Sequence, residues 1–457
     1  MGVTRRIIDA AAGSGPRCGQ GEVPAARGPR SDDGPGGRRA ALARLRDCAV
    51  LAGSAYAASG NALAQAPATE RIGIAFIDLL SGPYAPVGQG ALAHFRYLAD
   101  VANDRRWAGR ERSFEILTFD GEGDPARSLE RLDEAIGKGA RYVAQGSGSA
   151  VANALAQALE RHNAANPERP VLLLNFGAND PALTNERCTF WHFRFAPNAD
   201  QQMEALTSWL RGRDAVRRVF LINQDYAPGR ALAASAREML ARKRSDVEIV
   251  GDERHPIGGV GDFAPYVARI RQSGADTVIT GDWGADLVGL VRAARAARLP
   301  ADILSFHADA RGTATAISAD GEDRLHLVSA WSPNERSFGG AELREDFRRR
   351  RNLDFTLKPA YDAMRALSES IRRTGSADAL AVARAMSGLR FASLNGEVEM
   401  RAADHQLQQP LLVSSWQKAG AKGVRFDEER SGYGWQPEAL MPAYVGVQPT
   451  SCNMRRP

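Results

Sequence analysis

Short apolar runs alternate with longer segments of helical periodicity along most of this chain. Residues 142–145 and 171–175 are apolar runs of strand length, and residues 150–162 between them have the spacing of a helix. Strands that alternate with helices in this way predict βαβ units and a parallel sheet with helices on both faces. The sequence therefore predicts an α/β fold.

The same alternation occurs twice. In the first half we expect strands at residues 71–78, 114–119, 142–145 and 171–175, and helices at 89–105, 125–138 and 150–162. In the second half we expect strands at 218–223, 247–250, 277–280, 303–306 and 325–330, and helices at 229–244, 262–272 and 284–299. Two doubly wound parallel-sheet lobes of this kind leave a cleft between them.

The segments that follow these repeats have weaker patterns. Between the halves, residues 190–195 predict an extended, half-buried segment, because Trp191, Phe193 and Phe195 fall on one face and His192 and Arg194 on the other. Later we expect helices at 341–351, 360–373 and 377–386, and strands at 391–400 and 410–416, with Asn395-Gly396 as a turn. The last forty residues are rich in turn-forming types.

Two strand ends carry small and polar residues. The run at 171–175 leads into Gly177, Asn179, Asp180 and Pro181, and the run at 142–145 leads into residues 146–149, Gly-Ser-Gly-Ser. Such turns leave backbone N–H groups at the mouth of a parallel sheet, where open α/β sheets bind ligands. The two neighbouring turns predict a pocket for a small, anionic group.

Composition and motifs argue against several classes of protein. The formal charge of +5 arises from 59 Lys and Arg against 54 Asp and Glu, and much of the excess lies in the first fifty residues. No basic run is interleaved with aromatic residues, so we expect no nucleic-acid partner. No Walker loop, complete dinucleotide fingerprint, nucleophile elbow or zinc-type histidine pair occurs. We therefore expect no cofactor, no metal and no catalysis.

The N-terminal region reads as an export signal. Residues 1–37 are rich in Gly, Arg and Pro, and arginines between 38 and 46 precede a short apolar stretch at 48–59. Ala62-Leu63-Ala64 then fits a cleavage site, so residues 1–64 are predicted to be a disordered leader with a signal peptide that directs the protein to the periplasm. The alternative is an exposed N-terminal helix. The sequence contains no run of 18 apolar residues, so we expect no membrane span.

Two cysteines remain once this leader is removed. Cys188 and Cys452 are an even pair in an oxidising compartment, and we predict a disulfide that ties the C-terminal tail to the first lobe. Two unpaired thiols are the alternative.

Several motifs occur in an order that resembles a known family. They are residues 81–84 with Gly88, Asp120 with the helix start at Asp124-Pro125, residues 147–149, residues 179–184, Tyr226 after Gln224-Asp225, and the run 290–299. Over residues 72–416 the chain resembles the type I periplasmic solute-binding proteins of ABC importers, in the leucine/isoleucine/valine-binding branch.

The resemblance implies two lobes that close on a ligand through a hinge with three chain crossings, near Phe195, Trp331 and Asp404. Residues 70–195 with 332–404 would form lobe 1. Residues 196–331 with 405–457 would form lobe 2 and the C-terminal tail. A monomer is expected, with a membrane permease as partner.

The resemblance also implies the ligand site. In the first lobe the ligand's carboxylate and ammonium would be held by Ser147, Gly148, Ser149, Gly177, Ala178 and Asn179, with Tyr84 from the first motif. From the second lobe Tyr226 would close over the ligand. The alternatives are N-capping for Ser147 and Ser149 and an ordinary surface role for Tyr226.

Two features differ from the family pattern. Branched-chain binders carry a glutamate where this chain reads 306–309, Phe-His-Ala-Asp, so Asp309 or His307 would take that place. Trp283 follows another second-lobe strand and would stack on the ligand's side chain or pack in the core. The family's usual first-lobe disulfide is also missing. The residues at 306–309 and at 283 point away from a leucine-type substrate.

The function predicted from the sequence is that of an extracytoplasmic solute-binding receptor of an ABC importer, which binds an amino acid or a related small carboxylate. A ligand sensor of the same fold, or a doubly wound nucleotide-using enzyme, are the alternatives.

Overall fold

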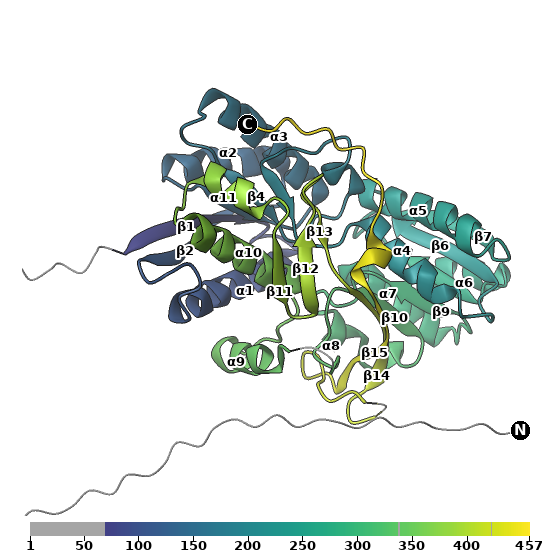
Figure 1. Cartoon of the computed structure of the whole chain (residues 1–457). Helices are drawn as coiled ribbons and strands as arrows, with labels where there is room; N and C mark the ends of the chain where they lie inside the picture. The colour runs from purple at the N-terminus through teal and green to yellow at the C-terminus, as the bar shows by residue number, and fades with distance from the viewer. Residues whose placement is uncertain (1–68, 337–338, 422) are drawn as a thin grey trace, which may run out of the picture. The chain divides into compact units, whose positions relative to one another are not determined.

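The computed structural model of the chain describes residues 69–336, 339–421 and 423–457. The predicted leader and signal peptide at residues 1–64 lie outside these residues. From residue 69 onward the chain forms two large sheets and one small sheet (Figure 1). Within this part of the chain, every helix is too short or too polar to cross a lipid bilayer.

The first large sheet is wholly parallel, as the sequence predicts. Its strand order is β2-β1-β3-β4-β5. The strands are β1 (Glu70–Asp78), β2 (Arg112–Asp120), β3 (Tyr142–Gln145), β4 (Leu172–Asn175) and β5 (His192–Arg194). Side chains alternate along β1, so that Ile74 and Phe76 enter one core and Ala75 and Ile77 enter the core on the opposite face. Both faces of this sheet are therefore buried.

Helices cover both faces of the first sheet. One face packs against α1 (Ala85–Asp104), α9 (Ala341–Arg351), α10 (Lys358–Thr374) and α11 (Ala379–Met386). The other face packs against α2 (Pro125–Gly137) and α3 (Ser149–Ala165). The predicted start of α2 is confirmed: the Asp124 carboxylate accepts the Arg127 N–H at 2.8 Å, and Pro125 occupies the first turn. We call this part of the molecule lobe 1.

The second large sheet has the order β15-β14-β10-β9-β8-β6-β7. Its strands are β6 (Arg218–Gln224), β7 (Glu248–His255), β8 (Thr277–Thr280), β9 (Asp302–Ser305), β10 (Leu325–Ser329), β14 (Leu411–Lys418) and β15 (Tyr433–Met441). Helices α4 (Ala199–Leu210) and α5 (Ala227–Lys243) cover one face. The other face packs against α6 (Ala264–Gln272), α7 (Gly284–Ala296) and α8 (Thr313–Ile317). This part is lobe 2.

The second sheet differs from the prediction at one edge. Strands β14 and β15 pair antiparallel, and β14 also pairs antiparallel with β10. The nine residues of β15 lie in the region that was expected to consist of turns. Gln436, Pro437 and Glu438 interrupt the apolar alternation by which a strand is recognised in a sequence. An edge strand tolerates such residues because it needs little apolar surface.

A small third sheet belongs to lobe 1. It joins β11 (Arg390–Ser393), β12 (Gly396–Met400) and β13 (Leu407–Gln408), and its apolar side chains enter the core of the first sheet. Strands β11 and β12 form the predicted hairpin. Gly396 has φ 103°, which explains why glycine ends this turn. Short 3₁₀ turns occur at η1 (Pro181–Thr184), η2 (Ser318–Gly321) and η3 (Ala443–Gly446).

The chain passes between the two lobes after β5, after β10 and after β13. The first two passages lie near the expected Phe195 and Trp331. The third was expected near Asp404, but β13 still pairs with β12, and the His405 C=O accepts the Arg194 N–H at 2.9 Å. The passage therefore falls at Gln409-Pro410.

The segment before the first passage is more buried than its pattern predicts. It is extended, but His192 and Arg194 are as buried as Trp191, Phe193 and Phe195, which alternate with them. The Arg194 guanidinium donates to Gln406 Oε1 and to the Asp180 C=O, both at 2.5 Å, and also to the Thr184 hydroxyl. Burial lowers the pKa of Arg194 to about 10. An alternating pattern cannot reveal that a charged face is covered when its partners are distant in the sequence.

The predicted disulfide between Cys188 and Cys452 is confirmed. It joins two residues that are 264 positions apart.

Candidate functional site

At the carboxyl edge of the first sheet, a buried carboxylate organises the turn after β3. Asp78, the last residue of β1, accepts the N–H groups of Gly146 at 3.0 Å and Ser147 at 3.1 Å on Oδ2, and that of Leu79 at 2.7 Å on Oδ1. Burial raises the pKa of Asp78, and these hydrogen bonds oppose the shift. The N–H groups of Gly146 and Ser147 are thus already occupied within the protein.

The turn after β4 is held in the same way. Asn175 Oδ1 accepts the N–H groups of Gly177 at 3.1 Å and Ala178 at 2.8 Å, and its Nδ2 donates to the Ala178 C=O at 3.0 Å. The expectation that Gly177 and Ala178 offer free N–H groups to a ligand is therefore wrong. A Cβ at Gly177 would lie 2.9 Å from the Gly146 carbonyl oxygen, so the two turns touch.

The remaining backbone donors at this edge belong to the first turn of α3. Gly148 is the N-cap, with φ 100°, and within the described chain no side chain caps this helix. N-capping by Ser147 or Ser149 is therefore not observed. The Ser149 hydroxyl instead accepts the Asp180 N–H at 3.3 Å, and the Ser147 side chain hydrogen-bonds to Asp78. The first N–H groups of a helix have no intrahelical acceptor, which leaves them available to an anion.

In lobe 2 the strand ends β6, β8 and β9 carry the other predicted residues. Tyr226 is the N-cap residue of α5 and Trp283 that of α7. The turn of Trp283 is fixed by its neighbour Asp282, which accepts the Gln224 N–H at 2.8 Å on Oδ1 and lies 2.9 Å from His255 Nε2 through Oδ2. Burial raises the pKa of Asp282.

A second carboxylate supports the same turn from α7. Asp286 Oδ2 accepts the Gln224 side-chain amide at 2.7 Å and the Gly258 N–H at 2.8 Å. Together, the two aspartates join the ends of β6, β7 and β8 into one platform. Sequence reasoning missed this platform, as it missed Asp78 and Asn175. The available signal was the polar residue that ends β1, β4 and β6, namely Asp78, Asn175 and Gln224.

Three aromatic residues meet where the lobes face each other. The rings of Tyr84 in lobe 1 and Trp283 in lobe 2 have centroids 4.7 Å apart and are tilted by 50°. Burial raises the pKa of Tyr226 to about 12, and a side-chain hydrogen bond with Trp283 opposes the shift. The sequence analysis assigned all three to the site, and the structure brings them together.

Asn179 and His307 form a second contact between the lobes. Asn179 Nδ2 lies 3.3 Å from His307 Nε2. Burial lowers the pKa of His307 to about 4, so its imidazole is neutral at pH 7. An amide and a neutral imidazole can each donate and accept a hydrogen bond, which suits a small polar ligand.

Asp309 has Glu428 as an electrostatic neighbour. Burial raises its pKa to about 6, and its charge is among the causes that raise the pKa of Glu428 in the β14–β15 loop. In the described residues no hydrogen bond or ion pair joins the Asp309 side chain to lobe 1. Of the two candidates in residues 306–309, His307 is the one that contacts the opposite lobe.

Two surface hollows lie apart from these contacts. One of about 500 Å³ is lined by residues of α9 with Arg105, Arg425 and Phe426. The other, of about 410 Å³, is lined by Asp225 and residues 254–257. Neither is lined by a predicted site residue. Within the described ranges, no three His, Cys, Asp or Glu side chains are grouped to hold a metal ion.

The sequence of this chain is similar to those of known proteins. Residues 71–421 match the model of a family described as periplasmic binding proteins. The chain is 29% identical over 422 residues to a Leu/Ile/Val-binding protein homolog 4 of Brucella abortus, a match that covers 89% of this chain and 98% of that protein.

Solved structures give the same fold. A leucine-, isoleucine-, valine-, threonine- and alanine-binding protein from Brucella ovis, in a closed conformation, has a TM-score of 0.76 and 28% identity, covering 85% of this chain and 100% of that one. A solute-binding protein of an ABC transporter from R. palustris, in complex with benzoate, has a TM-score of 0.70 and 17% identity, covering 84% and 99%.

Proposed function

We propose that this chain, which belongs to the periplasmic binding protein family, holds an amino acid or a related small carboxylate between its two lobes. The family consists of substrate-binding proteins of ABC transporters, so the chain is a binding protein and not an enzyme. On the same ground we place it in the periplasm, with a membrane permease as its partner.

The observation that carries this proposal is the pair of contacts between strand ends of the two lobes. Asn179 meets His307, and Tyr84 meets Trp283. A ligand bound beside these pairs touches both lobes at once. It therefore binds the closed arrangement more tightly than an open one and shifts the hinge equilibrium towards closure.

The donors at this position suit a carboxylate. The first-turn N–H groups of α3 and the Asn179 amide are on the lobe 1 side, and the Tyr226 hydroxyl is on the lobe 2 side. Trp283 and Tyr84 supply an apolar and aromatic wall for the rest of the ligand. Neutral His307 stands where branched-chain binders have a glutamate, so this chain lacks that charged partner for an ammonium group.

A ligand screen tests the proposal. The melting temperature of the protein is measured with L-leucine, L-valine, L-alanine, L-threonine, benzoate and 4-hydroxybenzoate, and positive ligands are titrated by calorimetry. We expect at least one to raise the melting temperature, because a ligand that binds only the native state stabilises it. A flat response to the whole set contradicts this ligand class.

Tyr226→Ala provides the matched test of the site. It should weaken binding of the ligand found in the screen about tenfold or more, with little change in the melting temperature of the free protein. Tyr433→Ala, at a tyrosine of the edge strand β15, is the control and should bind normally. Normal affinity with a large loss of stability in Tyr226→Ala would remove Tyr226 from the site.

A further inference from the structure

We propose that the C-terminal tail, residues 442–457, is a fourth connection between the lobes, and that the Cys188–Cys452 disulfide makes it hold the lobes in their closed arrangement. The inference concerns the ligand-free protein and is independent of which ligand binds.

The tail begins on lobe 2. It follows β15, the edge strand of the second sheet, and its η3 turn packs against α4. A Cβ on Gly446 would lie 3.8 Å from the Gln201 side chain of that helix. Since α4 packs on the sheet of lobe 2, this end of the tail is attached mainly to lobe 2, although η3 also touches β13 of lobe 1.

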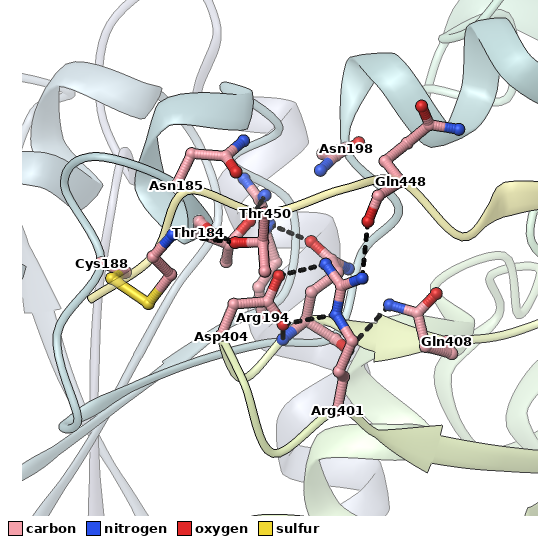
Figure 2. A network of polar contacts seen from close by, with 12 residues as sticks. Thr184, Asn185, Cys188, Arg194, Asn198, Arg401, Asp404, Gln408, Gln448 and Thr450 are labelled. Carbon is pink, nitrogen blue, oxygen red and sulfur yellow. Dashed lines mark hydrogen bonds and ion pairs between the residues drawn. A yellow bond between two sulfur atoms is a disulfide. The ribbon is translucent and has the colours of Figure 1, made fainter. Parts of the chain in front are cut away.

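The tail ends on lobe 1 (Figure 2). Arg401 Nη1 donates to the Gln448 C=O at 2.6 Å, and the Thr450 hydroxyl donates to the Thr184 C=O at 3.0 Å. The disulfide to Cys188 follows two residues later. Arg401 and Thr184 adjoin elements of lobe 1, so this end of the tail moves with lobe 1.

Beneath the tail lie two of the three passages between the lobes. Arg194, just before the first passage, donates to the Gln406 side chain, and Gln406 Nε2 donates to the Ala196 C=O at 2.9 Å. Thr184 contacts both Arg194 and the tail. Its hydroxyl accepts a hydrogen bond from the Arg194 guanidinium, and its carbonyl accepts one from the Thr450 hydroxyl. The tail is therefore connected through Thr184 to Arg194, which precedes the first passage.

The tail has little slack. Only Val447 separates Gly446, which lies on α4, from Gln448, which Arg401 holds. An extended chain spans at most about 3.5 Å per residue, so from Gly446 to Cys452 the tail reaches roughly 20 Å. A hinge rotation that carries α4 away from Arg401 and Cys188 must break contacts of the tail with one of the lobes.

The disulfide determines which contacts of the tail break when the lobes open. Without it, hydrogen bonds such as those of Gln448 and Thr450 hold this part of the tail on lobe 1, and single hydrogen bonds of this kind exchange readily with water. With it, the tail stays on lobe 1, and opening has to detach η3 from α4. Oxidation therefore raises the free energy of the open arrangement relative to the closed one.

The test uses the full chain without ligand. The variant Cys188→Ala/Cys452→Ala and the reduced native protein are compared with the oxidised native protein by small-angle X-ray scattering and by hydrogen exchange at the Tyr84 and Trp283 turns. We expect a larger radius of gyration and exchange at these turns that is about three- to tenfold faster. Arg384→Ala is the matched control, because Arg384 contacts the tail only beyond the disulfide, at the Pro457 C=O.

Two results would overturn the proposal. An unchanged radius of gyration and unchanged exchange in a folded variant would mean that the tail does not restrain the lobes. Unfolding of both the variant and the reduced protein would mean that the bond maintains the fold itself and not the relation between the lobes.

Discussion

Asn179 Nδ2 and His307 Nε2 lie 3.3 Å apart, although Asn179 follows β4 of one sheet and His307 follows β9 of the other. Each residue lies in the turn that follows the carboxyl end of a parallel strand, the place where doubly wound sheets bind ligands. The contact therefore joins the carboxyl edges of the two large sheets.

Asn179→Ala tests this contact. The substitution removes an amide that we place on the ligand, and the loss of one hydrogen bond predicts an affinity about tenfold lower. Calorimetric titration with the ligand found in the screen measures the change. Asn153→Ala, on α3 where the side chain bonds only to Gln157, is the control. Equal affinities of the two variants would contradict the assigned role of Asn179.

The loop of His307 and Asp309 predicts two opposite dependences on pH. The pKa of His307 is lowered to about 4, so its contribution to stability is complete above about pH 6.5 and is lost as the pH falls towards 4. The pKa of Asp309 is raised to about 6, so its contribution is complete below about pH 3.8 and is lost as the pH rises through 6.

Urea unfolding at pH 7 and pH 5 separates the two effects. When the pH is lowered from 7 to 5, the free energy of unfolding should fall less in His307→Gln than in the native protein. In Asp309→Asn it should fall more than in the native protein. We expect differences on the order of 1 kcal/mol, since both side chains are partly exposed. Shifts of the same sign in both variants would refute this assignment.

A buried ion pair beside the third passage predicts a large effect on stability. Lys358 and Asp362 are fully buried and paired, and Lys358 Nζ also donates to Gln409 Oε1 at 2.7 Å. Lys358→Met leaves the Asp362 carboxylate without its cation and should cost about 3–5 kcal/mol in the free energy of unfolding. The double variant Lys358→Met/Asp362→Leu should recover part of this loss in urea titrations. Additive losses would argue against coupling of the pair.

Two helical glycines predict opposite outcomes for the same substitution. A Cβ at Gly88 of α1 would lie 1.8 Å from the Leu79 carbonyl oxygen, whereas nothing lies within 4 Å of one at Gly137 of α2. Gly88→Ala should therefore cost about 3 kcal/mol or more, because backbone has to move. Gly137→Ala should gain roughly 0.5–1 kcal/mol. Thermal unfolding of both variants measures the difference, and a tolerated Gly88→Ala would mean that α1 can move away from β1.

Much of the fold follows from local pattern. The strands β3, β4 and β8 are short apolar runs bounded by small or polar residues, and the Asp124-Pro125 helix start has a direct capping explanation. Where the pattern was uninformative, the structure depends on distant partners. The two residues of β13 are too few to show a hydropathy pattern, and they form a strand by pairing with β12. β15 forms a strand by pairing with β14.

The candidate site was predictable in position but not in detail. Turns after parallel strands pointed to Asn179 and Trp283, and the family resemblance pointed to His307 or Asp309. The turn N–H groups were expected to bind a ligand, yet Asp78 occupies two of them from 68 and 69 residues away. No local pattern indicates which acceptor a backbone donor finds in the folded chain.

The covalent ring closed by Cys188 and Cys452 contains every residue of lobe 2. A single proteolytic cut anywhere in that lobe therefore yields two fragments that remain joined, and they separate on a gel only after reduction. The oxidised protein can be cleaved once in a loop of lobe 2, such as the one between β14 and β15, and still migrate as a single molecule.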